Sequence, residues 1–224
     1  MDLAVQIKMN PSLYVKDPEQ SDLGKRIVQH SIDAIYEYGF EDFTFKKLAS
    51  RINTTEASVY RYFENKHRLL TYITSWFWTW MEYQLVFYTN NLTDTQKKID
   101  ILIDLLVFNL EDKLLVDHIN KGKLQQIIIS EANKSYLTNH IDEDNKAQIF
   151  KPYKDLCHRI SEIFVDHNSK YKYSHSLSST LIETAHHQMY FQRHLPSLTD
   201  FGKTQNNKEL VCFLKDFIYK TLGT

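Results

Sequence analysis

The segment from Thr44 to Leu70 gathers the side chains of this sequence that are best suited to bind phosphate groups. Between residues 44 and 72, six lysines and arginines oppose two glutamates, which gives a net charge of +4. Residues 21–43 hold two cationic and five acidic side chains, a net charge of −3, so the total of −1 conceals a local imbalance. This distribution of charge is typical of a domain that binds nucleic acid. Taken alone, charged side chains on small helices are more simply explained as solvent-exposed groups.

Two short amphipathic segments with a tight turn between them would position these side chains. Residues 44–52 carry apolar side chains at helical spacing, and Asn53 then interrupts the pattern. Asparagine tolerates the left-handed backbone conformation that such a turn requires. Thr44 and Thr55 are suitable amino-terminal caps for the two segments. The pattern therefore predicts a helix-turn-helix, whose second helix would read a DNA groove.

The rest of the sequence predicts further helices. Five glycines and four prolines in 224 residues are too few for the frequent turns of a sandwich or a barrel. Helical periodicity begins at Asp22, and Gly39 lies where that first helix would end in a left-handed conformation. Asn65 begins another helix, and apolar helical spacing recurs downstream. We therefore expect an all-α protein.

Residues 1–20 stand apart from this helical pattern. Apolar residues, among them Val5 and Leu13, alternate with polar ones on both sides of Asn10-Pro11-Ser12. Alternation is typical of strands, and Asn followed by Pro suits the first two positions of a type I turn. The segment is expected to be either a short hairpin that packs against another element or a flexible arm.

Residues 23–70 resemble the DNA-binding domain of TetR-family transcriptional regulators. The matching residues are Gly39-Phe40, Phe43-Thr44-Phe45, Leu48-Ala49, Thr55, Val59-Tyr60-Arg61-Tyr62-Phe63, Lys66 and Leu69-Leu70. Beside the arm at residues 1–20, the resemblance implies a three-helix DNA-binding domain at residues 21–68 and a larger helical domain for ligand binding and dimerisation at residues 69–224. It also implies a ligand-responsive transcriptional regulator, most simply a repressor that a small apolar or aromatic inducer releases from its operator.

The resemblance also assigns DNA contacts to individual residues. Those expected at backbone phosphates are Thr44, Lys46, Lys47, Thr55, Tyr60, Tyr62 and Lys66, and those expected near base edges are Glu56, Ala57, Ser58 and Arg61. Arg61 is the main candidate for reading a base, because its planar guanidinium can pair with guanine O6 and N7. Glu56 stands where the family often has a basic residue, but its carboxylate can accept a hydrogen bond from cytosine N4.

An aromatic helix follows the DNA-binding motif. Residues 76–88 hold three tryptophans and other aromatic side chains on more than one helical face, which indicates burial between layers. Ordinary core packing explains any one of these residues. The resemblance implies that the helix connects the DNA-binding domain to an inducer pocket, and the residues expected to line that pocket are Trp80, Tyr83, Phe87 and Asn109.

The two helices nearest the carboxyl terminus are expected to form a homodimer. The resemblance places the interface at about residues 177–193 and 209–222, where four helices from two subunits would pack together. A dimer would bring two DNA-binding domains to half-sites about 34–36 Å apart, or a multiple of that helical repeat.

Features elsewhere in the sequence raise three other functions. Glu183-Thr184-Ala185-His186 resembles a di-iron ligand pair, but the second such pair, Glu64-Asn65-Lys66-His67, lies inside the DNA-reading region. A metal sensor is an alternative, because His186, His187 and His194 cluster near one helix end, although surface or dimer-interface positions explain these histidines more simply. The third is a protein-interaction module whose helix-turn-helix does not bind DNA.

The remaining features favour a cytoplasmic protein without enzymatic activity. Cys157 and Cys212 lack the spacing of a metal site or a disulfide framework. The first residues lack the pattern of a signal peptide, and the most apolar window, residues 72–88, is shorter than the ~20 apolar residues of a membrane span. No phosphate-loop, dinucleotide or nucleophile-elbow motif occurs, so we expect no catalysis, no cofactor and no bound metal.

Overall fold

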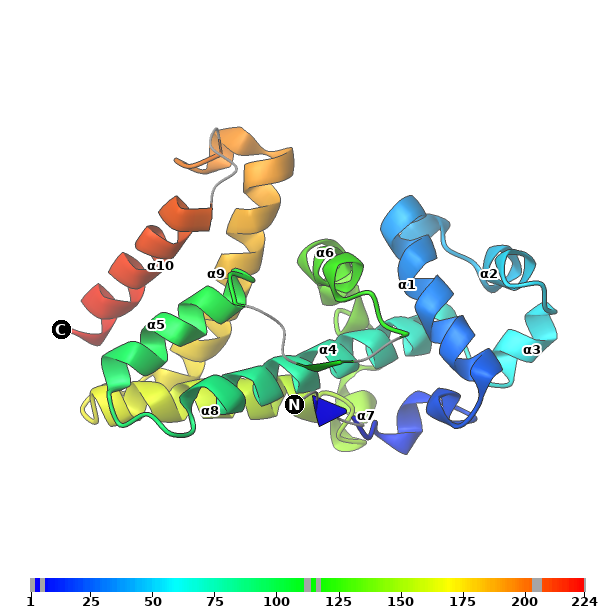
Figure 1. Ribbon diagram of the computed structural model, residues 1–224, viewed down its shortest axis with the longest axis horizontal. Helices are drawn as coiled ribbons and strands as arrows, with labels where there is room; N and C mark the ends of the chain where they lie inside the picture. The colour runs from blue at the N-terminus through cyan, green and yellow to red at the C-terminus, as the bar shows by residue number, and fades with distance from the viewer. Residues whose placement is uncertain (1–2, 5–6, 111–113, 116–117, 203–206, 224) are drawn as a thin grey trace. The chain divides into compact units, whose positions relative to one another are not determined.

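Figure 1 shows the computed structural model of the chain, which describes all residues except 1–2, 5–6, 111–113, 116–117, 203–206 and 224. The helices are α1 (Asp22–Asp42), α2 (Phe45–Arg51), α3 (Glu56–Tyr60), α4 (Lys66–Thr89), α5 (Thr95–Leu106), α6 (Lys121–Glu131), α7 (Ile141–Lys146), α8 (Lys151–His167), α9 (Ser174–His194) and α10 (Asn207–Leu222). Short 3-10 helices are η1 (Pro11–Leu13), η2 (Pro18–Gln20), η3 (Ala132–Ser135) and η4 (Pro196–Leu198). Two-residue strands, β1 (Leu3–Ala4) and β2 (Leu114–Leu115), pair in parallel. The all-α class is confirmed.

Contacts within the chain divide it into two compact units. The first comprises Met1–Trp78 and Lys113–Pro152, and the second comprises Thr79–Asp112 and Tyr153–Thr224. The division falls within α4, which continues unbroken through it. Residues 113–152, which were expected in a ligand-binding domain, thus lie in the same unit as the helix-turn-helix. The assignment of separate DNA-binding and ligand-binding functions to parts of the chain stays a prediction.

The core of the first unit joins α1, α2, α3 and the start of α4. Ile32, Leu48, Phe63 and Tyr72, from three of these helices and the loop before α4, have no exposed side-chain surface. The rings of Phe63 and Tyr72 meet edge to face with their centroids 5.3 Å apart. Since full burial of such a side chain stabilises a fold by roughly 1.5–3 kcal/mol, this cluster holds the short α2 and α3 on the longer helices.

In the part of residues 1–20 that the structure describes, the predicted amino-terminal hairpin is not present. Residues 11–13 make η1 instead, and the side chain of Asn10 caps it by accepting a hydrogen bond from the Ser12 N–H. The backbone N–H of Val15 then donates to the carbonyl of Tyr62. The alternation of apolar residues therefore reflects burial of side chains such as Leu13 within the first unit. Val5 lies outside the described residues.

The second unit is held together by the apolar faces of its helices. Leu102, Ile160, Leu181 and Leu214, one each from α5, α8, α9 and α10, are fully buried. The helices predicted at residues 177–193 and 209–222 correspond to α9 and α10. Among the helices of the described residues, none is both long and apolar enough to cross a membrane.

Candidate nucleic-acid interface

A tight turn joins α2 to α3, as the sequence predicted (Figure 1). Asn53 adopts a φ of 52°, which confirms the left-handed residue expected at this position. The N–H of Thr54 donates to the carbonyl of Ala49 at 2.9 Å, so the chain turns back over the end of α2. Ala49 is buried between the helices, whereas Ala57 is exposed.

Threonine hydroxyl groups cap both motif helices, which confirms the predicted helix starts. The Thr44 hydroxyl accepts a hydrogen bond from the Lys47 N–H, and that of Thr55 accepts one from the Ser58 N–H, each at 3.2 Å. Each cap is worth roughly 1 kcal/mol to its helix. Both threonines are exposed. The residues that cap both helices therefore lie at the surface, and the amino terminus of a helix at a surface favours an anion.

The side chains predicted to contact DNA divide into an exposed set and an inward set. The exposed set is Thr44, Lys46, Lys47, Thr55, Glu56, Ala57, Tyr60 and Arg61, while Ser58 and Lys66 are partly buried and Tyr62 is buried. Tyr60 is 48% exposed, and its ring packs edge to face on Phe45. Val59 and Phe63 point into the core. The exposed set on α2 and α3 forms the candidate interface.

Two of the predicted phosphate contacts hold the motif together from inside. The Tyr62 side chain is only 3% exposed, and its hydroxyl shares a hydrogen bond of 2.8 Å with that of Ser21, the cap of α1. The Lys66 ammonium donates to the carbonyls of Phe40 and Glu41 at 3.0 Å and to that of Phe43 at 3.3 Å. In this arrangement, all three ammonium hydrogens bind the backbone.

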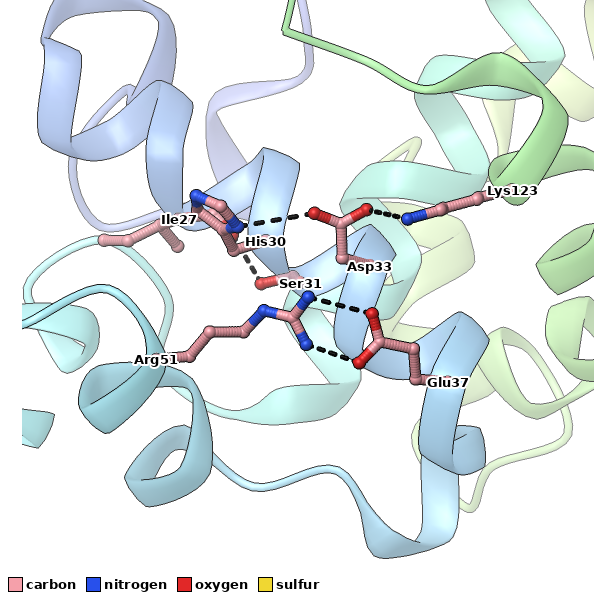
Figure 2. Close-up of polar contacts among 7 residues, drawn as sticks. All are labelled: Ile27, His30, Ser31, Asp33, Glu37, Arg51 and Lys123. Carbon is pink, nitrogen blue, oxygen red and sulfur yellow. Dashed lines mark hydrogen bonds and ion pairs between the residues drawn. The ribbon is translucent and has the colours of Figure 1, made fainter.

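Two arginines hold α2 against α1, a feature that the sequence pattern does not indicate. The guanidinium of Arg51 donates two hydrogen bonds to the carboxylate of Glu37, at 2.6 and 2.8 Å (Figure 2). Arg26 of α1 donates to the carbonyl of Ile52, the cap residue of α2, at 2.5 Å. The hydrogen bond from Arg51 lowers the pKa of Glu37 below its ordinary value, against the opposing effect of desolvation. A bidentate pair of an arginine and a carboxylate fixes the orientation of the two side chains as well as their distance.

A basic hollow of about 600 Å³ lies between α1 and α2. Its lining residues are Ala34, Tyr38, Lys46, Lys47, Ser50 and Arg51. Within it, the Lys47 ammonium donates to the carbonyl of Asp42 at 2.7 Å and lies 5.7 Å from the centroid of the half-exposed Tyr38 ring. Lys46 and Lys47 belong to the candidate interface and also line this hollow, whereas Arg51 there is paired with Glu37.

The residues predicted to line an inducer pocket differ in their exposure. Trp80 is 3% exposed in the second unit, whereas Tyr83 and Phe87 are 45% and 50% exposed. The Asn109 amide donates to the carboxylate of Asp104 at 3.2 Å. Glu82, on the same helix as the aromatic residues, receives two hydrogen bonds from Arg159 of α8. Ligand binding by these four predicted residues stays a prediction.

The histidines that suggested a metal sensor have different surroundings. His186 is buried beside the ring of Phe108, contrary to the expected surface or interface position, and burial lowers its pKa to about 3. His187 and His194 are exposed. The carboxylate of Glu183, from the di-iron-like pair, accepts a hydrogen bond from Tyr153. In the described parts of the chain, histidine, cysteine and acidic side chains do not gather in groups of three or more that could hold a metal ion.

A comparison with protein families matches residues 27–73 to the family described as "Bacterial regulatory proteins, tetR family". The matched range starts within α1 and ends within α4, so it contains the whole helix-turn-helix. No curated protein matches the sequence significantly.

Solved structures with a similar fold extend over most of the chain. The fatty acid degradation regulator FadR from Bacillus halodurans is 17% identical over 88% of this chain and 97% of its own, with a TM-score of 0.56. AibR in complex with isovaleryl coenzyme A and operator DNA is 14% identical over 88% and 97%, with a TM-score of 0.54. The superantigen PfiT is 12% identical over 92% and 96%, with a TM-score of 0.56. At these identities the similarity establishes the fold, and the different names show that the fold does not by itself fix a function.

Proposed function

We propose that the chain is a repressor that a small ligand releases from its operator, and that residues 27–73, which match the TetR family of bacterial regulatory proteins, belong to its DNA-binding domain. The observation that carries the proposal is the exposed surface of α2 and α3. Both helices present capped amino termini to solvent, and cationic side chains surround them. Such a surface suits the phosphates on both sides of a DNA major groove.

The candidate contacts have distinct roles in this proposal. Thr44, Lys46, Lys47, Thr55 and Tyr60 bind backbone phosphates and set the position of the domain on the duplex. Glu56, Ala57, Ser58 and Arg61 lie at or beside the reading helix and contact base edges. Tyr62 and Lys66 contribute by holding the motif in shape, since their polar groups already bind Ser21 and the end of α1.

A homodimer through α9 and α10 would supply the second DNA-binding domain. One face of α10, with Leu210, Leu214 and Ile218, is already buried within its own subunit. The face that remains for a second subunit includes Phe213, which is 39% exposed and stacks on Phe217 with ring centroids 6.5 Å apart. Exposed aromatic residues of this kind are typical of interface centres.

The ligand is proposed to be a small molecule with an apolar or aromatic group. The second half of α4 is rich in aromatic residues, and the helices of the second unit have apolar faces. Residues of these types are the ones that line pockets for apolar ligands. The structural neighbour AibR binds isovaleryl coenzyme A, which carries a branched apolar acyl group. This supports an apolar group in the ligand of the present chain without identifying the ligand.

Selection from a library of random-sequence duplexes tests the central proposal. The native protein should enrich a duplex with two related half-sites, and it should bind that duplex at least ~10³-fold more tightly than random sequence. If the protein binds DNA no better than an acidic control polymer, or enriches no sequence, the helix-turn-helix has a different role. Interaction with another protein would then be the next function to test.

Substitution of Arg61 should distinguish base reading from phosphate binding. We expect R61A to weaken binding to the selected duplex by about 1–3 kcal/mol, because one bidentate contact with a base is worth that much. R61K is the matched control, since it keeps the charge but loses the planar fork. If Arg61 reads a base, both variants relax the sequence preference at one position of each half-site. If R61K binds with native affinity and preference, Arg61 is a phosphate contact.

A further inference from the structure

A break in α1 lies directly before the DNA-reading helices. Gly39 has φ 77° and ψ 161°, outside the helical range, and the chain makes one further turn to Asp42 before α2 begins at Phe45. The break removes the usual helical acceptor of the Phe40 N–H and leaves several carbonyls without helical donors. The direction of this last turn decides where α2 starts.

Side chains from two distant helices satisfy the groups that the break leaves open. The Glu131 carboxylate, at the end of α6, accepts a hydrogen bond of 3.2 Å from the Phe40 N–H. Lys66 of α4 binds the carbonyls that follow, including those of Phe40 and Phe43. Lys134 ties these groups together, because its ammonium lies 2.8 Å from the Glu131 carboxylate and 2.9 Å from that of Glu41.

A second set of polar contacts connects α6 to the middle of α1. Lys123, near the start of α6, lies 2.5 Å from the carboxylate of Asp33, which also faces His30 at 3.3 Å. Glu37 lies one turn further along α1 and holds Arg51 of α2. Figure 2 shows the two carboxylates of this stripe turned to different helices, Asp33 to α6 and Glu37 to α2. Helix α1 is thus fixed by ionic contacts both to α6 and to the helix-turn-helix.

We propose that Glu131 is a positioning residue for DNA recognition, which holds the broken end of α1 in the direction that lets α2 and α3 fit the major groove. The inference rests on the proposed function and adds a role for α6 in DNA binding. The path of the chain links this role of Glu131 to the second unit. Residues 113–152 enter the first unit after α5 and leave it before most of α8, and both of these helices belong to the second unit. The segment that carries Glu131 is therefore joined at both ends to the other unit.

The effect should appear in specific DNA binding and not in binding to random sequence. Attraction between cationic side chains and phosphates tolerates small changes in the orientation of the domain. Contacts with base edges require α3 to lie at one position in the groove. We expect E131A to weaken binding to the duplex that the native protein selects by roughly 5–150-fold, the usual size of such coupling. Affinity for random-sequence duplex at the same salt concentration should stay unchanged.

The choice of variants separates positioning from general stability. E131Q keeps an oxygen acceptor for the Phe40 N–H and should restore most of the specific affinity. E143A is the matched control, because Glu143 has a largely exposed carboxylate in the same unit. If E131A does not fold in a thermal unfolding assay, E131D replaces it, since the shorter side chain keeps the charge but withdraws the acceptor.

Each outcome decides the proposal. Native specific affinity in E131A, or an equal loss of specific and random-sequence binding that E131Q shares, would overturn the positioning role. For E131D, native specific affinity would do the same. If the native protein selects no duplex at all, the proposed function fails first, and the role of Glu131 in it fails as a consequence.

Discussion

Affinity for the selected duplex should fall ~10³–10⁵-fold when the salt concentration rises from 50 to 200 mM, if a dimer neutralises roughly 6–10 phosphates. The reason is the release of counterions from DNA when cationic side chains and helix amino termini take their place. In the proposed interface, Lys46, Lys47 and Arg61 are exposed and lie close in the sequence to two capped helix starts, and a dimer would hold two such sets. The measurement is a titration of labelled duplex at several salt concentrations, plotted as the logarithm of affinity against the logarithm of salt.

A single lysine tests which surface produces this dependence. K46A should reduce the steepness of the salt plot by about 2 for a dimer, since each subunit loses one phosphate contact. K172A is the matched control, because Lys172 is an exposed lysine of the second unit. A plot without slope would reject phosphate neutralisation as the basis of binding. If K46A and K172A change the slope of the salt plot equally, the phosphate contacts do not lie at Lys46.

The free energy of unfolding should fall as the pH is lowered below about 6.5, and His186 should cause part of the fall. Burial, with a smaller contribution from the charge of His187, lowers the pKa of His186 from 6.5 to about 3. Between these values the unfolded chain binds a proton that the folded chain excludes, so stability is complete above pH 6.5 and is lost toward pH 3. The loss amounts to about 1.4 kcal/mol per pH unit, or about 3 kcal/mol between pH 6.5 and 4.

Denaturant unfolding at a series of pH values checks this prediction. H186Q removes the titrating group, so its plot of unfolding free energy against pH should be flatter than that of the native protein over this range. H187Q serves as the control, since His187 is exposed and its replacement should leave most of the slope. The prediction fails if H186Q loses stability with falling pH as steeply as the native protein.

Much of the helix-turn-helix could be predicted because its signals are local. Thr44 and Thr55 cap their helices, and Asn53 takes the left-handed conformation, as expected from the preferences of these residue types. Gly39 has the expected positive φ, but one more turn of helix follows it before α1 ends at Asp42. Each of these features depends on a few neighbouring residues, so it can be inferred without knowledge of the rest of the fold.

The direction of individual side chains was harder to predict. Tyr60 and Tyr62 are both tyrosines in the same short motif, yet one is 48% and the other 3% exposed. The hydroxyl of Tyr62 hydrogen-bonds that of Ser21, and the ammonium of Lys66 donates to a carbonyl near the end of α1. The partners are far apart in the sequence, and local patterns do not predict such contacts. On α4, aromatic residues occur on several faces, so periodicity did not reveal that Tyr83 and Phe87 would be about half exposed.

The sequence by itself determined the all-α class and the helix-turn-helix with its caps, because composition, periodicity and short motifs record local conformational preference. Its short motifs also carry the similarity of residues 27–73 to the TetR family. Only the tertiary structure decided how α1 is held. Glu37 with Arg51, Asp33 with Lys123, and Glu131 with the Phe40 N–H join helices that are far apart in the chain. Such pairs form only after hydrophobic burial has brought the helices together. The sequence around a charged residue in an amphipathic helix does not indicate which other helix that residue will contact.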